Sequence, residues 1–588
     1  MYFLSRWLLR ISVLIWIGVA VLGAVASWPV SGFVLFVAYA ARMVRRQKRS
    51  WDTMGSARWA TVRELRQAGM LSSDSGIILG RVVDHTSFAA TAAAVLWGRS
   101  TAKEACERFR YIFKRRRYHL VRSNRAVHTA IFAPSGVGKG VSICIPFLRG
   151  CSDSAVVLDP KGELAKATAE YRKRVFGHDV VLLDPFCVAT KSPDCLNPLD
   201  FIEADSALAL DECNDLAKAL VVRGDEEKEP HWNDSAEAWI SAFIAVVIRY
   251  GEDHGTRSLQ TVRELLSDPK RLDLAIKLMQ ESDAWGGMLR RSGGQLLHFV
   301  DREKSSTLST VLRQLRFLDT PTVEASTRHS SFDPRKLRSG KMTIYLVLPP
   351  EHSKALSALQ RMWISSLLRS VVKQGLCDEQ TVHFVLDEAS SLGRLEVLDE
   401  AIDKYRAYGI KLQFYFQSLG QLAACFPNGR DQTLLSNTTQ IYFGCNDTAT
   451  AEMISNRLGD ATVLLESGGT STGTSRQYTM GCHPSESSSY SRNDNSNWSL
   501  HGRRLLKPDE VIALNPRVAI TFTPGVRPLC TCLVRYYEEK LCDARPSRCR
   551  RMARAIGTFS SSAAVLVLSL FFAGATTVII DSILMPRR

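Results

Sequence analysis

Residues 133–140 have the types and spacing of a phosphate-binding turn. They read Ala-Pro-Ser-Gly-Val-Gly-Lys-Gly and follow an apolar run, 127–132, that is typical of a buried strand. A strand that leads through glycines and a lysine into a helix presents backbone N–H groups and a positive helix end to phosphates. The common pattern is G-x-x-x-x-G-K-[ST], so Ala133 replaces its first glycine and Gly140 replaces the hydroxyl residue that usually touches Mg²⁺. We expect nucleotide phosphates to contact Ser135, Gly136, Val137, Gly138, Lys139, Gly140 and Val141.

A pair of carboxylates follows a second apolar run, residues 382–386. In a nucleotide-hydrolysing site, Asp387 would hold Mg²⁺, usually through water, and Glu388 would orient the water that attacks the terminal phosphate. A strand that ends in an acidic turn is common by itself, but together with the glycine-rich turn it favours binding of ATP with Mg²⁺. The pattern therefore points to an ATPase, while the hydroxyl missing at Gly140 leaves metal affinity and turnover open.

A glutamine ends a third strand-like run, residues 412–416. Gln417 is suited to contact the γ-phosphate, although a glutamine at the end of a strand is more often only a cap. An arginine from a neighbouring copy could complete the site, and Arg406 and Arg457 are candidates. We predict Lys139, Asp387, Glu388 and Gln417 as the catalytic residues, with Asp387 as the metal ligand.

The elements that must position these residues read as an α/β fold. Apolar runs at 155–158, 180–183 and 342–348, each followed by a polar loop, predict a mostly parallel sheet with ligands at its carboxyl edge. The core is split into 126–202 and 336–540 by a helix-rich segment, 203–335, which we expect to be an inserted all-α domain. Within the second part, 466–501 is rich in Ser, Gly, Asn and Thr and predicts a flexible loop, and a final hairpin follows at 518–537.

The charge of the 588-residue chain is concentrated, although its net value of +16 at first suggests a nucleic-acid binder. Three runs, 42–50, 108–125 and 545–554, contain basic residues and no acids, and without them the chain is nearly neutral. The first run follows apolar stretches at 8–27 and 30–41, which predict a transmembrane hairpin within residues 1–50 and a cytoplasmic body. A cleaved signal peptide is the alternative, but export would separate the site from ATP and expose 14 cysteines to oxidation.

The other two basic runs have weaker implications. Residues 51–125 read as a membrane-proximal basic linker, and its run at 108–125 could bind acidic lipid or DNA, or form only a solvated helix face. Residues 541–588 combine the third run with an apolar segment, 556–580, that is either a further transmembrane helix or an amphipathic or buried one. Cysteine and histidine spacing shows no metal-binding constellation.

In this order, the motifs resemble the coupling proteins of type IV secretion systems (TraG/TraD class, related to FtsK and RecA-like motors). The resemblance covers about residues 115–540. It is carried by PSGVGKGVSICIPFL (134–148), VVLDPKGEL (156–164), LLDPF (182–186), NPLDFI (197–202), HWNDSAEAWI (231–240), FVLDEASSLGRLEVLDEAI (384–402), GIKLQFYFQSLGQL (409–422), LLSNTTQIYFG (434–444), AEMISNRLGDATV (451–463) and RRLLKPDEVIALNP (503–516).

The resemblance implies a RecA-like P-loop ATPase, anchored by N-terminal helices in the bacterial inner membrane and assembled as a homo-hexamer. Such a protein recruits relaxase–DNA complexes or protein effectors and delivers them to inner-membrane components of a secretion channel, and its inserted helical domain recognises substrates. Family members with Lys-Gly at this turn are familiar, whereas a C-terminal membrane segment departs from the pattern. Two alternatives remain, an FtsK-like DNA translocase and a membrane receptor that uses nucleotide only to assemble.

Overall fold

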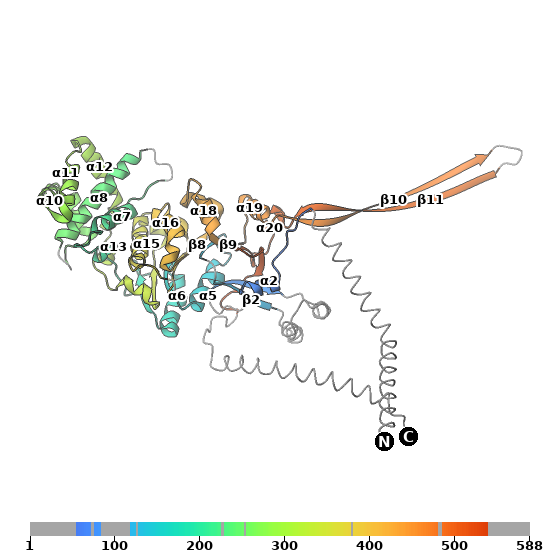
Figure 1. The fold of residues 1–588 in the computed structure, drawn as a ribbon, viewed down its shortest axis with the longest axis horizontal. Helices are drawn as coiled ribbons and strands as arrows, with labels where there is room; N and C mark the ends of the chain where they lie inside the picture. The colour runs from blue at the N-terminus through green and yellow to red at the C-terminus, as the bar shows by residue number, and fades with distance from the viewer. Residues whose placement is uncertain are drawn as a thin grey trace, which may run out of the picture. The chain divides into compact units, whose positions relative to one another are not determined.

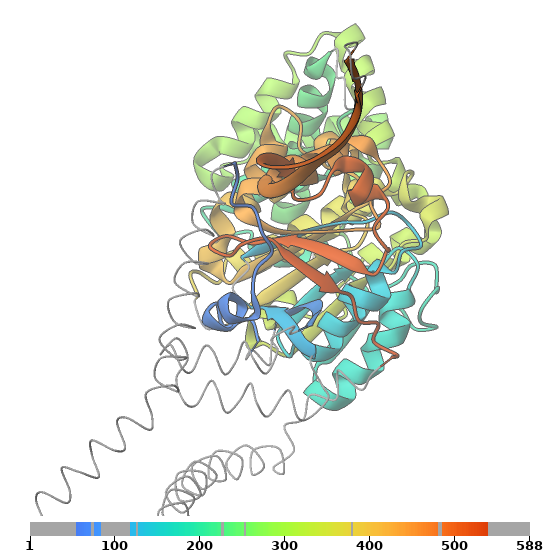
Figure 2. The same ribbon diagram turned by 90° about the vertical axis from the view of Figure 1, so that its right-hand side faces the viewer.

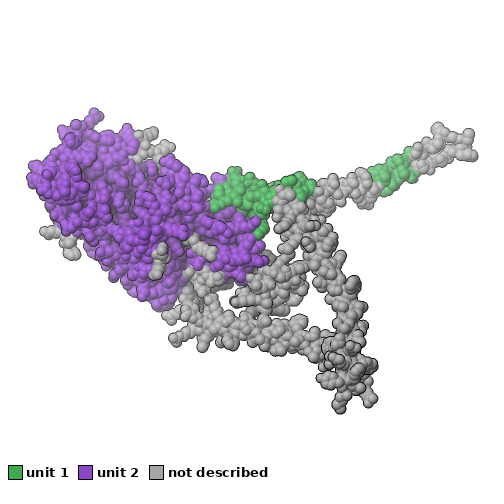
Figure 3. Space-filling view, in the orientation of Figure 1, with its two compact units in different colours: residues 1–58, 451–511 green, residues 59–450, 512–588 purple. Residues whose placement is uncertain are grey.

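The computed structural model describes residues 54–71, 76–83, 118–124, 127–224, 229–251, 255–377, 380–479 and 485–538. The chain divides into two compact units, residues 1–58 with 451–511, and residues 59–450 with 512–588 (Figure 3). The predicted transmembrane hairpin, most of the basic linker and the segment 541–588 lie outside the described residues. Within the described ranges, the helices are all too short or too polar to span a bilayer.

The larger unit is built on one mixed sheet, whose described strands run in the order β2-β1-β13-β12-β9-β3-β8-β7-β4-β6-β5. The seven strands from β9 to β5 form six parallel pairs, and the four remaining pairs of the sheet are antiparallel. The parallel strands are β3 (His128–Phe132), β4 (Ser154–Leu158), β5 (Asp179–Leu183), β6 (Met342–Leu346), β7 (Val382–Leu386), β8 (Ile410–Phe416) and β9 (Thr438–Phe443). The antiparallel strands are β1 (Ile77–Val83), β2 (Tyr118–Ser123), β12 (Val518–Phe522) and β13 (Leu529–Cys532).

The central strands form where the sequence has short continuous apolar runs. Every residue of β3, β4, β6 and β7 is buried, because helices cover both faces of a parallel sheet. On one face, Ile131, Val157 and Val385 belong to a core shared with α5 (Ile145–Gly150) and α6 (Glu163–Tyr171). The expected α/β fold with a mostly parallel sheet is confirmed.

The antiparallel edge joins segments that are far apart in the chain. Arg81 of β1 lies opposite Cys532 of β13, and Figure 2 shows the blue N-terminal strands beside the orange-red C-terminal ones. The predicted final hairpin is present as β12 and β13, with the second strand shorter than expected.

The described elements between β5 and β6 are all helical (green in Figure 1). α7 packs against α8, and α15 (Ser357–Val372) packs against α7, so this segment continues into the sheet-bearing unit. Its treatment as a separate domain with the bounds 203–335 stays a prediction. The helices are α7 (Ala209–Leu220), α8 (Pro230–Tyr250), α9 (Leu259–Ser267), α10 (Pro269–Glu281), α11 (Ala284–Leu296), α12 (Asp301–Gln314) and α13 (Pro321–Thr327).

Further helices follow in both units. They are α2 (Val62–Gln67), α14 (Pro350–Ser353), α16 (Glu396–Lys404), α17 (Leu419–Cys425), α18 (Arg430–Asn437), α19 (Thr448–Leu458) and α20 (Pro508–Ile512).

The flexible loop predicted for 466–501 is wrong. In its place lie two 20-residue strands, β10 (Asp460–Thr479) and β11 (Ser485–Arg504), drawn in orange in Figure 1. They pair antiparallel without a break, from Asp460 opposite Arg504 to Thr479 opposite Ser485. A strand whose two faces are both polar carries no alternation of apolar residues, so composition alone reads it as a loop. Backbone pairing, which composition does not report, decides the structure here.

Candidate functional site

Three neighbouring strands bring the predicted site residues to one edge of the sheet. β8 lies between β3 and β7, with Phe416 level with Phe132 and Phe414 level with Leu386. The glycine-rich turn after β3, Gln417 after β8 and the Asp387–Glu388 pair after β7 therefore leave the sheet at its carboxyl edge. This is the edge at which open parallel sheets bind ligands.

The glycine-rich turn has the backbone conformation that its glycines permit. Gly136 and Gly138 have φ angles of +84° and +97°, which side-chain-bearing residues rarely adopt. A Cβ on Gly136 would find no atom within 4 Å, so this part of the turn opens onto free space. The turn is anchored to the sheet, because the Ala133 N–H donates to the Phe416 carbonyl at 3.0 Å.

The helix after the turn starts with a wide π-helical turn. This segment, η1 (Gly140–Cys144), runs into α5, and the Ser142 N–H donates to the Gly138 carbonyl at 3.0 Å. π-turns of this kind occur often at functional sites. At Gly140, a Cβ would lie 3.7 Å from Leu164 Cδ2, which is ordinary contact, so the space admits the serine or threonine that the common pattern has there.

Two carboxyl groups and two lysines gather at this edge. Burial raises the pKa of Asp387 to about 6, and Lys139 opposes that rise. Burial also raises the pKa of Asp159 to about 6, with Asp387 adding to the effect. Burial lowers the pKa of the Lys139 ammonium, which Asp387 stabilises. Lys161 adds a second positive charge close to Asp387. Buried opposite charges of this kind are typical of sites that bind charged ligands.

Asp159 and Lys161 belong to this group but were missed as site residues. They follow β4, whose last residue Leu158 is level with Leu386 at the end of β7. The Asp159 carboxylate accepts the Ala165 N–H at 2.8 Å and thereby fixes the start of α6. The run Asp-Pro-Lys-Gly after an apolar strand was visible in the sequence, but the position of β4 beside β7 was not.

Glu388 has a strained backbone. Its φ of +70° and ψ of 53° place a non-glycine residue in the left-handed region, immediately before the 3-10 helix η6 (Ala389–Leu392). Such conformations cost about 1–3 kcal/mol and persist mostly at functional positions. Glu388 lines a cavity of about 380 Å³ together with Pro160, Lys354 and Ser390. The strained residue therefore borders an open space, and its charge lies close to Asp387.

Gln417 occupies the predicted position between the turn and the acidic pair. Its backbone N–H donates to Gln421 Oε1 at 2.8 Å, which fixes the turn into α17. The structure places Lys139, Asp387, Glu388 and Gln417 at one edge, and their catalytic roles stay predictions. Both candidate fingers, Arg406 and Arg457, are exposed.

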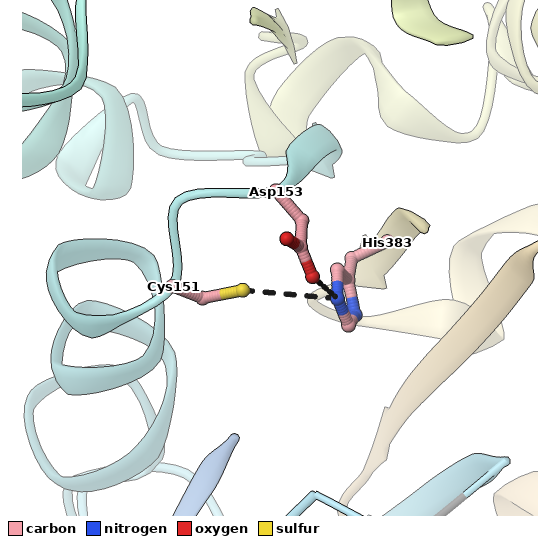
Figure 4. Close-up of side chains that lie close together, drawn as sticks. All are labelled: Cys151, Asp153 and His383. Carbon is pink, nitrogen blue, oxygen red and sulfur yellow. Dashed lines mark hydrogen bonds and ion pairs between the residues drawn. The ribbon is translucent and has the colours of Figure 1, made fainter. Parts of the chain in front are cut away.

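A second group of polar side chains lies at the opposite, amino edge of the sheet (Figure 4). Cys151 Sγ is 3.7 Å from His383 Nε2, which is 3.1 Å from Asp153 Oδ2. The sequence showed no such constellation, because His383 on β7 and the turn before β4 meet only through the pairing of the two strands. The three side chains can ligate a metal by type, so their surroundings decide what they do.

The surroundings favour hydrogen bonding over metal binding. Burial raises the pKa of the Cys151 thiol to about 12 and lowers that of His383, so both are neutral. His383 Nδ1 is buried with no hydrogen-bond acceptor among the described residues, whereas a metal-bound histidine normally donates from its second nitrogen. Lys411 lines the same small cavity, of about 60 Å³, and would repel a cation. We assign this group to the support of the sheet.

Comparison with known proteins gives the family. Residues 58–558 match the family described as Type IV secretory system Conjugative DNA transfer. The conjugal transfer protein TraG of Escherichia coli is 28% identical over 432 residues, which cover 70% of this chain and 65% of TraG. The protein VirD4 of Rhizobium radiobacter is 27% identical over 497 residues, or 83% of this chain and 64% of VirD4. The chain thus spans slightly less than two thirds of the length of these relatives.

Solved structures show the same fold. The bacterial conjugative coupling protein TrwBdeltaN70 has a TM-score of 0.51 at 18% identity, with 69% of this chain and 84% of that chain covered. The resemblance predicted from the ordered motifs is therefore confirmed, and the edge where the glycine-rich turn meets the acidic pair lies inside the matched region. The chain belongs to the coupling-protein family of type IV secretion systems.

Proposed function

We propose that this protein is the coupling ATPase of a type IV secretion or conjugation system. It recruits relaxase–DNA complexes or protein effectors and uses ATP to deliver them to the inner-membrane components of the secretion channel. The observation that carries the proposal is the meeting of Lys139 in an open glycine-rich turn with the half-buried Asp387 and the strained Glu388. Family membership supplies the link to conjugative transfer.

The residues at the edge suit ATP and Mg²⁺. The turn offers room beside Gly136, and Lys139 carries positive charge toward the phosphates. Asp387 would hold Mg²⁺, and burial beside Glu388 disfavours its charge until a cation compensates it. Mg²⁺, when bound, neutralises charge on the phosphates. The plasmid coupling protein TrwB, which has this fold, was solved in complex with the non-hydrolysable analogues GDPNP and ADPNP, which supports nucleotide binding by this chain.

The chain's own residues then divide the reaction between them. The N–H groups of residues 135–141 and the Lys139 ammonium bind and orient the phosphates. Glu388 orients a water for attack on the γ-phosphate. Gln417, at the end of the neighbouring strand, contacts that phosphate. An arginine of an adjacent subunit stabilises the charge that develops in the transition state. The site is complete only between subunits, which accords with a homo-hexamer.

Membrane attachment belongs to the proposal as well. Two apolar stretches, 8–27 and 30–41, precede the basic run 42–50. This order supports an anchor in the bacterial inner membrane with the body in the cytoplasm. Of the three basic runs, 108–125 is the one that we propose to contact DNA.

One observation favours a second candidate function. Gly140 lacks the hydroxyl that usually touches Mg²⁺, which is what a membrane receptor that binds nucleotide without turning it over would tolerate. Because the site has room for a side chain at this position, Gly140→Thr tests the point. A motor hydrolyses ATP with Gly140 already in place and keeps turnover in Gly140→Thr. If the wild type shows no turnover and Gly140→Thr gains it, the missing hydroxyl is what makes the natural protein a receptor.

A transfer assay tests the proposed function. In a deletion strain, complementation with the wild-type chain should restore plasmid transfer or effector delivery, and measuring both identifies the substrate class. Lys139→Ala should abolish transfer while the protein still fractionates with the membrane. Lys173→Ala, which removes an exposed lysine two residues after the end of α6 and outside the helical segment 203–335, is the matched control and should transfer normally. Normal transfer by Lys139→Ala would contradict a motor role.

A further inference from the structure

The segment after β13 returns to the glycine-rich turn. Leu533 donates its N–H to the Arg517 carbonyl at 2.7 Å, and the Tyr536 N–H donates to the Val141 carbonyl at 3.1 Å. A turn closes the segment, because the Glu538 N–H donates to the Arg535 carbonyl at 3.1 Å. The Glu538 side chain pairs with Arg517. Residues 533–538 are thus fixed at both ends and cross the start of the helix that follows the turn.

Tyr536 anchors this crossing. Its ring packs against the core, with the Arg149 guanidinium 5.8 Å from the ring centroid. Arg149 in turn lies 4.5 Å from the ring centroid of Tyr171 on α6. The Tyr536 ring is therefore half-buried against the core, whereas Tyr537, the next residue, is exposed.

Arg535 and Tyr537 form a pair beside the glycine-rich turn. Arg535 Nε lies 4.0 Å from the position that a Cβ of Gly138 would occupy. Arg535 Nη1 donates to Tyr537 Oη at 2.8 Å. The Tyr537 side chain is 58% exposed, a large exposed aromatic surface next to a site for phosphates. Its ring meets that of Tyr536 edge to face at a centroid distance of 5.4 Å, which limits its movement.

We propose that Arg535 and Tyr537 form the nucleoside subsite of the nucleotide site. This inference rests on the proposed function, since a nucleoside lies here only if the turn holds its phosphates. Tyr537 stacks on the base, and Arg535 contacts the ribose–phosphate end near Gly138. A purine has a flat apolar face that an exposed tyrosine can cover, and stacking of this kind strengthens binding whichever base is present. Stacking from one side reads no base edge, so adenine and guanine are accepted alike.

The test separates nucleoside binding from phosphate binding. Full-length protein in detergent, with Mg²⁺ present, is titrated by calorimetry with ATP, GTP and inorganic tripolyphosphate. Tyr537→Ala should weaken ATP and GTP binding by about tenfold and leave tripolyphosphate binding unchanged. Tyr537→Phe keeps the ring and should stay within about twofold of the wild type. Tyr490→Ala, which removes a tyrosine that is 69% exposed on β11, is the matched control and should bind as the wild type does.

Each other result counts against a defined part of the inference. Equal ATP affinity in the wild type and Tyr537→Ala would overturn the nucleoside subsite. Weaker tripolyphosphate binding in Tyr537→Ala would also overturn it, because the residue would then only support the turn. If Lys139→Ala bound ATP and tripolyphosphate as tightly as the wild type does, the proposed function itself would be wrong. The nucleoside subsite would then be wrong as well.

Discussion

The two edges of the parallel sheet both hold titratable side chains, but their backbones differ. At the carboxyl edge, Gly136 and Gly138 have positive φ angles, Glu388 is strained, and space is open beside them. At the amino edge, the turn carrying Cys151 and Asp153 is tied down by hydrogen bonds.

The ties at the amino edge come from two buried side chains. The Arg172 guanidinium donates to the carbonyls of Leu148, Cys151 and Asp153, and His178 Nε2 lies 3.0 Å from the Ser152 carbonyl. Nearly every polar group of this turn is thus satisfied within the protein. The comparison indicates that a cluster of titratable groups is a better candidate for a ligand site where the backbone leaves open space than where hydrogen bonds fix the turn that carries it.

Breaking the amino edge should have the largest effect on stability. Arg172→Ala removes the three carbonyl bonds and the 2.7 Å bond from Nε to Thr343 Oγ1, leaving buried acceptors without donors. We expect the free energy of unfolding to fall by about 4 kcal/mol. Urea denaturation measures it, with Arg174→Ala, an exposed arginine two residues further along the chain, as the control. A loss below about 1 kcal/mol would show that the amino edge is not the supporting edge we describe.

Breaking the carboxyl edge should affect turnover and spare stability. Glu388→Gln keeps the shape of the side chain but removes the group that orients water, so ATP turnover should fall by about 100-fold while ATP still binds. Phosphate release and calorimetry measure the two effects. Asp153→Asn, at the amino edge, should keep turnover near the wild-type value. Equal losses of ATP turnover in Glu388→Gln and Asp153→Asn would contradict the functional difference that we assign to the two edges.

The raised pKa of Asp387 at the carboxyl edge should make the free energy of unfolding depend on pH. Burial raises the pKa of Asp387 from 3.8 to about 6, so between pH 4 and pH 6 the folded state holds a proton that the unfolded chain has lost. The free energy of unfolding therefore falls as pH rises through this window. Asp387→Asn should remove that decline and be more stable than the wild type by about 2 kcal/mol at pH 7.5, with the gain vanishing near pH 4.

Nucleotide-free protein is required for this comparison, because Mg²⁺ or ATP would change the charge around Asp387. Denaturation curves at several pH values measure the effect, and Asp211→Asn, which removes an exposed charge on α7, is the matched control. A constant difference between Asp387→Asn and the wild type across pH 4–7.5 would contradict the assigned burial of this carboxyl group.

The strain at Glu388 predicts the smallest effect. Glycine adopts a φ of +70° without a penalty, so Glu388→Gly should unfold at higher urea concentration than Glu388→Gln, by about 1 kcal/mol in free energy. Both variants lack the carboxylate, so the loss of its charge does not contribute to the difference between them. If Glu388→Gly were the less stable of the two, the left-handed conformation would not be a source of strain.

Much of this fold could be predicted from the sequence because buried parallel strands are short apolar runs. The runs ending at Phe132, Leu386 and Phe416 are visible without any structure, and the residues that follow them are the predicted site residues. Since parallel strands end at a common edge, Lys139, Asp387 and Gln417 could be expected to come together.

What remained hidden depends on which strands become neighbours. The sequence gives no sign that β4 lies beside β7, and this pairing is what adds Asp159 and Lys161 to one edge and joins Cys151 to His383 at the other. The polar strands β10 and β11 carry no apolar alternation, and a positive φ at Glu388 leaves no trace in residue type.

The most direct test of the central claim is ATP turnover by the purified full-length protein with Mg²⁺. We predict that the wild type hydrolyses ATP, that Lys139→Ala is slower by at least about 100-fold, and that Lys173→Ala equals the wild type. Unchanged turnover in Lys139→Ala would contradict the claim that the carboxyl edge is the hydrolytic site. Tight ATP binding by the wild type with no turnover would instead identify a receptor that uses nucleotide only to assemble.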